Sequence, residues 1–591
     1  MEGGITDTFA RHWRRWLVVL WLAAAAWCVQ DRWDVIRVFV LPDTDDNMRM
    51  MQVRALLAGQ SWFDLRQYRL DPPFGANIHW SRLVDLPLAG IILAMRPFVG
   101  GLLAEKVAVT LAPMLPMAVG MGAIAVIARR LIAPNAYLVA IALLLCAHST
   151  RFMWMPMRID HHGWQLAFLS LVAAGLTDRQ PVRGGLFIGL ATGLSLTIGL
   201  ELLLLLTAAG AIVGLMWVHD RSDAGRLAAY GATLSAGTGL GYLLFASYAN
   251  RAPVCDALSP VWLSAMMGAG GLCVLLAAIG PQARRWRLAL ALGGAVLLAA
   301  AFAWSWPHCL GKLEGVSPEA QKLWLSNVRE ARPIYRQSWA VIVSFVSLAL
   351  PGYAILLWHH RRDREMLIPW AALTVLATGA ATILLWQTRA GPSAQLLAVP
   401  GAAGLTWLVV RAILHSRHAI VRVLGTVGSF LLISGLPAQF ATSELVKGDT
   451  TPRTQRINRA NRLCPSLAAL HPVALLPRGY VLTMIDLSPR LITVTHHDAV
   501  TGPYHRNDAA IVDVIGTFMG TADHAHRMIE RRGIDYVLIC PNFSESTNYE
   551  VRSPRGFYTQ LRNDKAPPWL QPIPLPANSP LKMWKVIKSG S

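Results

Sequence analysis

The sequence predicts a polytopic α-helical membrane protein with a small α/β domain at its C-terminus. Of its 591 residues, 54% are hydrophobic and only 15% are charged, which is far from an average soluble domain. Long apolar runs recur up to about residue 440, and short strand-like runs replace them afterwards. The net charge of +20 would suggest a nucleic-acid partner in a soluble chain. Here the arginines lie mostly in short loops between apolar runs, so no nucleic-acid partner is predicted and the basic side chains are expected to meet lipid headgroups.

Apolar runs that can cross roughly 30 Å of hydrocarbon give about thirteen predicted spans. Arginines precede the first run as in a secretory signal, but the many runs that follow favour a retained first helix. The boundary near Glu201 is the least distinct. The predicted spans are 16–31, 103–128, 136–150, 163–176, 186–199, 202–218, 228–246, 261–280, 288–305, 339–358, 366–386, 391–412 and 420–439.

Arginine clusters occupy alternate loops between these spans, and the positive-inside rule makes those loops cytoplasmic. An odd number of spans then places the C-terminus outside the cytoplasmic membrane. The predicted membrane domain is 1–440, with a large first external loop (32–102) and an external loop at 306–338. The predicted extracytoplasmic α/β domain is 441–591.

The first loop carries carboxylates and arginines near its start. Apolar residues alternate with arginines after Asp43, which predicts a helix along the membrane interface with an aspartate cap. Arg49 breaks the positive-inside trend, and a phosphate-bearing ligand is one reason to keep it outside.

The tail pattern predicts strands at 480–485, 491–495 and 534–539, and a helix from Ala509 to Arg532 that ends at Gly533. The seven cysteines contain no CxxC pair, so no zinc or redox motif is predicted. Four of them lie in the predicted external segments, where oxidation allows two disulfides whose pairing the spacing leaves open: Cys255, Cys309, Cys464 and Cys540.

The polar stretch before the span at 163–176 contains Asp160, His161 and His162. An acid and two histidines are costly beside lipid, so we interpret them as a functional site rather than a polar interface turn. Carboxylate and imidazole ligands suit Mn²⁺ or Mg²⁺. If the first loop folds back over the helices, further carboxylates come within reach; otherwise they are a helix cap and a solvated turn. These carboxylates are Asp43, Asp45 and Asp46.

Three further features have two interpretations each. Arg389, at the outer end of a span, either binds phosphate or anchors the interface. Glu201 either lines the site or marks a turn between two short spans. The charged loop 306–338 is either a mobile flap over the site or a solvated amphipathic helix.

The motifs resemble those of the GT-C superfamily of membrane glycosyltransferases, in particular the catalytic subunits of archaeal and bacterial oligosaccharyltransferases. Asp43 with Arg49 matches the first motif, and Ile159-Asp160-His161-His162 matches the second, with Arg158-Ile159 where the family often has Gly-x. The resemblance implies that Asp43, Asp160 and His162 bind a divalent metal. Other GT-C enzymes have an alternative register that would favour Asp45 or Asp46.

The tail lacks the Trp-Trp-Asp motif with which oligosaccharyltransferases hold an acceptor sequon, which disfavours peptide N-glycosylation. The predicted function is transfer of a sugar or glycan from a polyprenyl phosphate or pyrophosphate carrier to a polysaccharide, glycolipid or protein acceptor. Arg49 and Arg389 are expected to contact phosphate, and Asp45 or Asp46 to activate the acceptor. No nucleotide-binding loop is found. A transporter or lipid flippase is the main alternative, and a scaffold for envelope assembly is a third.

Overall fold

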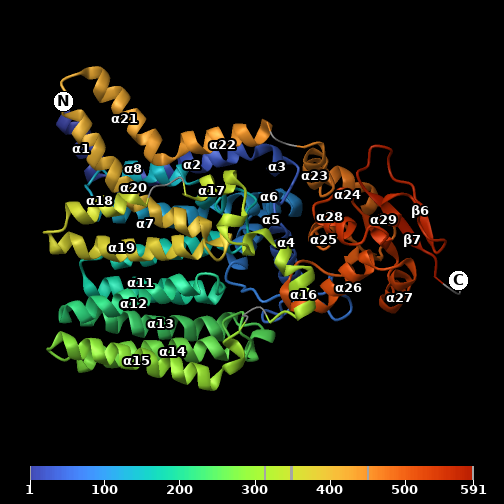
Figure 1. The fold of residues 1–591 in the computed structure, drawn as a ribbon, viewed down its shortest axis with the longest axis horizontal. Coiled ribbons are helices and arrows are strands. Elements are labelled where there is room, and N and C mark those ends of the chain that lie inside the picture. Colours follow the sequence, from blue (N-terminus) through green and yellow to red (C-terminus); the bar gives the residue numbers. More distant parts are fainter. Residues whose placement is uncertain (1, 312–314, 347–349, 449–450, 589–591) are drawn as a thin grey trace. The chain divides into compact units, whose positions relative to one another are not determined.

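A computed structural model describes the chain except residues 1, 312–314, 347–349, 449–450 and 589–591. The chain divides into two compact units that interleave along the sequence (Figure 1). Unit 1 comprises Met1–Trp33, Trp80–Leu313 and Arg329–Val446, and unit 2 comprises Asp34–His79, Glu314–Val328 and Lys447–Ser591. Each of the two predicted external loops, 32–102 and 306–338, therefore contributes residues to both units.

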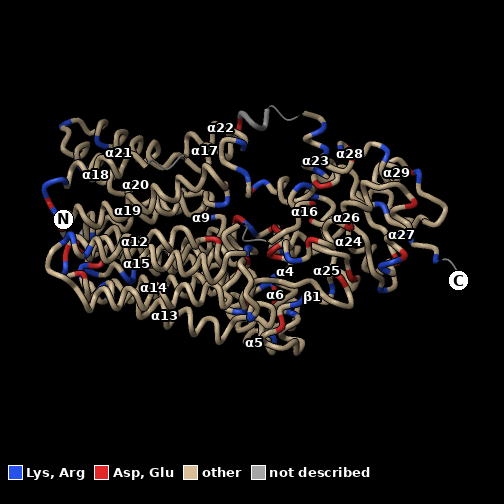
Figure 2. The backbone as a smooth tube through the Cα atoms, turned by 60° about the horizontal axis from the view of Figure 1, so that its bottom comes forward, with Lys and Arg blue, Asp and Glu red and all other residues tan. Residues whose placement is uncertain are grey.

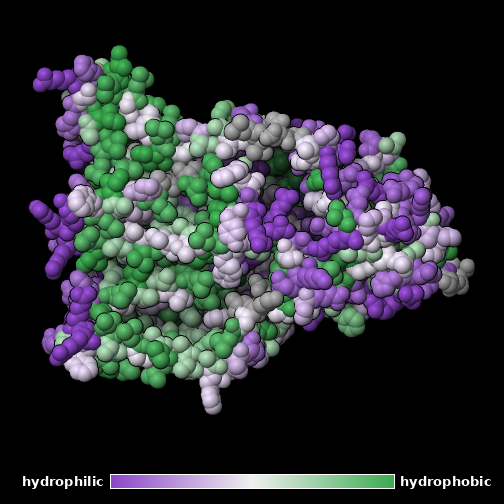
Figure 3. All heavy atoms as spheres, in the orientation of Figure 1, coloured by the Kyte–Doolittle hydropathy of each residue, from purple (hydrophilic) through white to green (hydrophobic). Residues whose placement is uncertain are grey.

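Unit 1 consists of helices, and their apolar side chains form a continuous buried core. Hydrophobic residues also cover much of the visible helix surface, while hydrophilic residues gather at the loops (Figure 3). The helices are α1 (Glu2–Arg11), α2 (Trp13–Asp31), α5 (Asp85–Val99), α6 (Gly101–Leu111), α7 (Met114–Leu131), α8 (Tyr137–Cys146), α9 (His148–Phe152), α10 (His162–Leu176), α11 (Pro181–Ile198), α12 (Leu203–His219), α13 (Ala224–Phe245), α14 (Pro260–Ile279), α15 (Arg284–Ser305), α17 (Trp339–Val346), α18 (Pro351–His359), α19 (Arg364–Ile383), α20 (Gly391–Leu414), α21 (Ala419–Ser434) and α22 (Leu436–Gly448).

Among the described residues, seven helical segments are long and apolar enough to cross a membrane, and the bent pair α21–α22 would make eight. Three shorter apolar helices, α8, α10 and α12, coincide with predicted spans. Many apolar helices are thus confirmed, whereas the predicted count of about thirteen spans is not. The seven segments are Gly101–Leu131, Pro181–Ile198, Pro260–Ile279, Arg284–Ser305, Trp339–His359, Arg364–Ile383 and Thr388–Leu414.

Helices α11 and α13 approach each other through glycines, as membrane helices commonly do. A Cβ atom at Gly189 would lie 2.5 Å from the Tyr230 carbonyl oxygen, and one at Gly185 would overlap the Arg226 carbonyl. Only glycine therefore permits this backbone separation at these two positions.

The two ends of α10 differ in charge. At its C-terminal end, Asp178 accepts from Arg130 Nη2 at 2.6 Å and from Arg183 Nε at 2.8 Å. Asp160 precedes the opposite end of the helix. Figure 2 shows lysines and arginines at the loops of unit 1. Arg130 and Arg183, which contact Asp178, therefore lie at one end of α10, and Asp160 lies at the other end.

Unit 2 is an α/β domain with a five-stranded sheet in the order β4-β3-β5-β7-β6. Strand β3 pairs in parallel with β4 and β5, while β7 pairs antiparallel with β5 and β6. Its elements are α4 (Thr44–Leu57), β1 (Arg66–Gln67), β2 (Ala76–Asn77), α16 (Pro318–Leu323), α23 (Pro452–Leu463), α24 (Leu467–Ala474), β3 (Tyr480–Leu482), α25 (Ser488–Val494), β4 (Asp498–Ala499), α26 (Asp508–Met519), α27 (Ala522–Arg532), β5 (Tyr536–Ile539), α28 (Ser546–Arg552), α29 (Phe557–Arg562), β6 (Leu570–Ile573) and β7 (Lys582–Val586); α3 (Trp33–Arg37) begins at the boundary of the units.

A segment of the first loop extends this sheet. The Ala499 N–H donates to the Arg69 carbonyl, and the Asp71 N–H donates to the Ala499 carbonyl, both at 2.9 Å. Leu70 and Ala499 thereby form a parallel bridge beside β4. The first loop and the tail consequently build one domain, although more than 400 residues separate them in the sequence.

Two predicted tail elements are wrong. The segment 491–495 belongs to helix α25, because Pro489 fits the first turn of a helix and the buried Arg490–Thr493 lack the alternation of a half-exposed strand. The predicted helix 509–532 breaks at Gly520, after which Thr521 caps α27 by accepting from the His524 N–H. The predicted end is confirmed, since Gly533 adopts a φ of +67°.

The predicted helix after Asp43 is confirmed as α4, but it is not an interfacial surface helix. Its residues Met48–Val53 are buried, and α4 packs against α25 within unit 2. The loop 306–338 contains the short helix α16 and 3-10 turns rather than one amphipathic helix.

Both permitted disulfides form, and the structure gives their pairing. Cys255 is bonded to Cys309 in unit 1, and Cys464 to Cys540 in unit 2. The second bond joins the end of α23 to the residue that follows β5. Loop closure of this kind restricts the unfolded chain and stabilises small domains.

Candidate functional site

The Asp160 turn is held in an uncommon backbone conformation. Met157 has a φ of +75°, which non-glycine residues rarely adopt, and its N–H donates to the Val109 carbonyl at 2.8 Å. Gly163 follows in the first turn of α10, where a Cβ atom would lie 2.8 Å from the Met153 carbonyl oxygen. The Met157 hydrogen bond before Asp160 and the close packing of Gly163 after it therefore fix the backbone of the turn that carries Asp160.

The Asp160 carboxylate is buried and lies among three cationic or potentially cationic groups. It accepts from the Arg158 guanidinium, it lies 3.1 Å from His162 Nδ1, and its second oxygen accepts from the His162 backbone N–H at 3.1 Å. Burial raises the pKa of Asp160, but Arg158 and the two histidines outweigh burial and hold it below its ordinary value. Asp160 is therefore an anion, which is the form in which a carboxylate binds a metal ion.

Glu201 joins this cluster from the turn between α11 and α12. His161 Nε2 lies 2.8 Å from Glu201 Oε1, and the Gln165 amide donates to Glu201 Oε2 at 2.5 Å. Burial raises the pKa of Glu201, but His161 outweighs it and leaves the pKa well below the ordinary value. Glu201 thus lies in the turn between two helices and contacts His161 and Gln165, so the structure is compatible with both interpretations of this residue. The buried His161 Nδ1 has no hydrogen-bond partner among the described residues.

Arg389 occupies the 3-10 turn that precedes α20, where it forms an ion pair with Glu330 across 3.7 Å. The charge of Glu330 also acts on the His162 imidazole, so these groups occupy one neighbourhood of unit 1. A pocket lies beside Asp160, and most of its lining is apolar. Its lining includes Leu88, Pro113, Pro116, Met153, Ile159 and Trp164.

The remaining predicted site residues lie on α4 in unit 2. Asp43 is the N-cap, where its Oδ1 accepts from the Thr44 N–H at 2.7 Å. Asp46 and Arg49 are fully buried, whereas Asp45 is half-buried. Of the three predicted metal ligands, Asp160 and His162 belong to unit 1, whereas Asp43 belongs to unit 2.

Two acidic residues of the tail accompany Asp43. Withdrawal from water and the Asp43 carboxylate raise the pKa of Asp486 to about 6. Burial and Asp486 raise the pKa of Glu545 to about 8, although Glu545 accepts from the Ile485 and Asp486 N–H groups and from the Tyr549 hydroxyl. Burial and the carboxylates of Asp45, Asp43 and Asp486 raise the pKa of Tyr504 well above 10.

Sequence reasoning missed Asp486 and Glu545, although a signal was present. Each follows one of the neighbouring parallel strands β3 and β5 in the chain. The carboxyl ends of parallel strands share one edge of a sheet, where polar side chains often form binding sites. Arg158 was also missed as a partner of Asp160, although it lies only two residues upstream.

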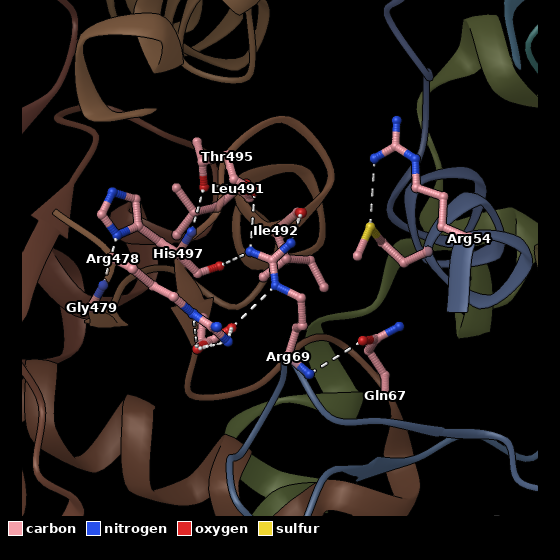
Figure 4. Close-up of polar contacts among 11 residues, drawn as sticks. Arg54, Gln67, Arg69, Arg478, Gly479, Leu491, Ile492, Thr495 and His497 are labelled. Atoms are coloured by element: carbon pink, nitrogen blue, oxygen red, sulfur yellow. Dashed lines mark hydrogen bonds and ion pairs between the residues drawn. The ribbon is translucent and has the colours of Figure 1, made fainter. Parts of the chain in front are cut away.

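Arg69 attaches the first loop to the tail (Figure 4). Its guanidinium donates to the carbonyls of Ile492, Thr495 and His497, and its Nε donates to Asp498 Oδ1 at 3.1 Å. Arg478 contacts the same Asp498 carboxylate from the solvent side. One side chain thus donates to three carbonyls at the end of α25 and in the turn that follows it.

Helix α4 is held by the same tail segment. Arg54 Nη1 donates to the Thr493 carbonyl at 2.7 Å, and the Thr493 hydroxyl donates to the Asn47 carbonyl at 3.3 Å. The Tyr504 hydroxyl donates to the Thr44 carbonyl at 3.2 Å. The position of Asp43 within unit 2 therefore depends on tail residues.

Asp160 and His162 offer the types of donor atom that a hard divalent cation accepts. Carboxylate oxygens and imidazole nitrogens are available at Asp160 and His162, and the unpaired His161 Nδ1 is a further buried polar atom at the same place. Arg158 now contacts the carboxylate and would share it with a bound ion.

No family model matches the sequence, and no curated protein matches it. Solved structures do match. The oligosaccharyltransferase AglB from Archaeoglobus fulgidus, in complex with an inhibitory peptide and a dolichol-phosphate, matches with a TM-score of 0.64 and 15% identity, over 95% of this chain and 73% of that one. The chain has the fold of an archaeal oligosaccharyltransferase.

Two other structures of the archaeal oligosaccharyltransferase agree with this likeness. A form tethered to an acceptor peptide with an NVT sequon has a TM-score of 0.61 at 15% identity, covering 93% of this chain and 72% of that chain. A complex with Zn and sulfate has a TM-score of 0.59 at 14% identity, covering 88% and 67%. At these identities the likeness concerns the fold, and it agrees with the GT-C resemblance of the motifs.

Proposed function

We propose that this chain is a membrane glycosyltransferase that transfers a sugar or glycan from a polyprenyl phosphate or pyrophosphate carrier to an acceptor outside the cytoplasmic membrane. The observation that carries the proposal is the buried cluster of Asp160, His161, His162 and Glu201 in a chain with the fold of an archaeal oligosaccharyltransferase. Buried charges at the end of apolar helices are costly and therefore indicate function.

The residues have distinct roles in this proposal. Asp43, Asp160 and His162 would hold a divalent cation, Mn²⁺ or Mg²⁺, which would stabilise negative charge on the departing phosphate. Arg49 and Arg389 would bind the phosphate, since guanidinium groups match phosphate geometry. Asp45 or Asp46 would accept the proton of the attacking acceptor group.

The acceptor is a polysaccharide, a glycolipid or a protein in this proposal. The tail lacks the Trp-Trp-Asp motif, which argues against a peptide sequon. The unit 2 carboxylates Asp43, Asp45 and Asp486 act electrostatically on Tyr504 and would favour an acceptor with hydroxyl or amino groups.

Metal removal tests the proposal. Purified protein in proteoliposomes, given a fluorescent polyprenyl-linked donor and candidate acceptors, should lose transfer in EDTA and regain it with Mn²⁺. Asp43→Asn should stay inactive after Mn²⁺ addition, because it lacks a predicted ligand. Asp34→Asn is the matched control, because this side chain of unit 2 is 92% exposed and forms a surface ion pair with Arg37. Transfer that is insensitive to EDTA, or an active Asp43→Asn protein, would refute the metal-assisted mechanism.

A further inference from the structure

Helix α23 presents an arginine face to solvent. Arginine occurs at every third position, and the helix contains no acidic residue. All four arginines are exposed, and none forms a hydrogen bond or an ion pair with the residues that the structure describes. They are Arg453, Arg456, Arg459 and Arg462.

Other residues of α23 are fixed to unit 2. Ala460 is buried, and Asn461 Oδ1 accepts from the Ser544 N–H at 2.9 Å. Cys464 caps the helix end and is bonded to Cys540. At the other end, the Thr451 hydroxyl accepts from the Thr454 N–H, which caps the first turn. These contacts attach α23 to unit 2, so its four arginines project from a helix that is fixed to the domain.

The preceding chain is apolar. Helices α21 and α22 together are long and apolar enough to span a membrane, but the axis of α22 bends away from that of α21 by 63°. Two apolar side chains of α22 are exposed, Leu436 at 37% and Phe440 at 70%. A helix that turns from the spanning direction with exposed aromatic and aliphatic residues is typical of the membrane interface. Along the chain, only residues 449–451 separate α22 from α23.

We propose that the arginine face of α23 binds the anionic headgroups of phospholipids at the membrane surface. Clustered basic residues next to a membrane segment are attracted to anionic lipids, and the attraction decays within the Debye length of the solution. Guanidinium groups also form paired hydrogen bonds with phosphate oxygens. The inference is independent of the proposed enzymatic function, because it uses none of the site residues. Lipid is favoured over a soluble polyanion because the arginines follow an apolar helix directly.

A fluorescent reporter on α23 tests the inference in the full-length protein. The three free cysteines Cys28, Cys146 and Cys273 are replaced by alanine, both disulfides are kept, and Asn458→Cys carries an environment-sensitive dye. The labelled protein is placed in nanodiscs of phosphatidylcholine alone or of an equal mixture with phosphatidylglycerol. The neutral quencher acrylamide then reports the access of water to the dye.

We expect quenching to fall several-fold in the anionic nanodiscs and to recover at about 1 M salt, where the Debye length is about 3 Å. The double variant Arg456→Gln with Arg459→Gln should remove the lipid difference, and glutamine preserves helix propensity. Its matched control is Arg527→Gln with Arg555→Gln, which removes the same charge from two exposed positions elsewhere in unit 2. Circular dichroism confirms that both variants are folded.

Two outcomes would overturn the inference. Equal quenching in neutral and anionic nanodiscs would show that α23 does not contact anionic lipid. Protection by a soluble anionic polysaccharide in neutral nanodiscs, without protection by anionic lipid, would assign the arginine face to a glycan partner instead. Neither outcome bears on glycan transfer, so the proposed function would remain to be judged by its own experiment.

Discussion

Asp160→Asn should abolish glycan transfer while the protein stays folded. The substitution removes the negative charge that faces Arg158 and His162 and removes a predicted metal ligand. Loss of a residue that merely supports a metal ligand typically costs about 10–100-fold in activity, so loss of the ligand itself should cost more than about 100-fold. Turnover per molecule of folded protein is the quantity to measure.

Asp178→Asn is the matched control for this experiment. Both carboxylates have side chains that are 1% exposed, and both form ion pairs with arginine. Asp178 lies at the opposite end of α10, so its replacement should lower stability without changing turnover. If the two variants lost turnover equally, the Asp160 effect would be structural and the residue would lose its catalytic role.

Arg69→Met should loosen the junction between the first loop and the tail. It leaves three carbonyls and the Asp498 carboxylate without the guanidinium, and hydrogen bonds of charged groups contribute about 1.5–3 kcal/mol each. We expect a local loss of about 3 kcal/mol, which corresponds to roughly 100-fold more frequent opening of α4 and α25. Hydrogen exchange of the full-length protein measures this opening segment by segment.

Arg478→Met separates this effect from simple loss of an ion pair. Arg478 contacts the same carboxylate, but its side chain is 67% exposed, against 25% for Arg69. An exposed pair contributes about 1 kcal/mol or less, so exchange in α4 should rise less than about fivefold. Equal exchange in the two variants would contradict the structural role assigned to Arg69.

Much of the fold was predictable because lipid imposes a strong pattern on sequence. Long apolar runs with arginines between them indicate membrane helices, and most predicted runs coincide with helices of unit 1. Some predicted runs correspond to helices such as α10 and α12, which are shorter than a typical membrane span. Apolar composition alone therefore does not determine the number of membrane-spanning helices. Strands β3 and β5 were predicted because short β-branched and aromatic runs lie between turn signals.

The elements that failed depend on tertiary contacts. Helix α25 contains Ile492 and Thr493, which favour strands locally, but packing against α4 and burial on all sides override that preference. The bridge between Leu70 and Ala499 joins segments distant in the chain, and no local pattern encodes such a partner. Unit 2 therefore could not be predicted as a single domain from the sequence.

For the candidate site, charge in an apolar context was the signal that the sequence offered. Asp160 and His162 were selected because polar residues before an apolar helix are costly, and the structure places these two side chains in contact. Asp486 and Glu545 were missed because acids after strands in a soluble-like domain are common. Their relation to Asp43 appears only when the first loop and the tail are folded together.

The most direct test of the central claim is product stoichiometry in proteoliposomes that contain the purified protein and a polyprenyl-linked glycan donor. Mass spectrometry should detect one free polyprenyl phosphate or pyrophosphate for each glycosylated acceptor, and neither product should form with Asp160→Asn. Movement of intact donor across the bilayer without cleavage of its glycosyl bond would contradict the account and identify the chain as a lipid flippase.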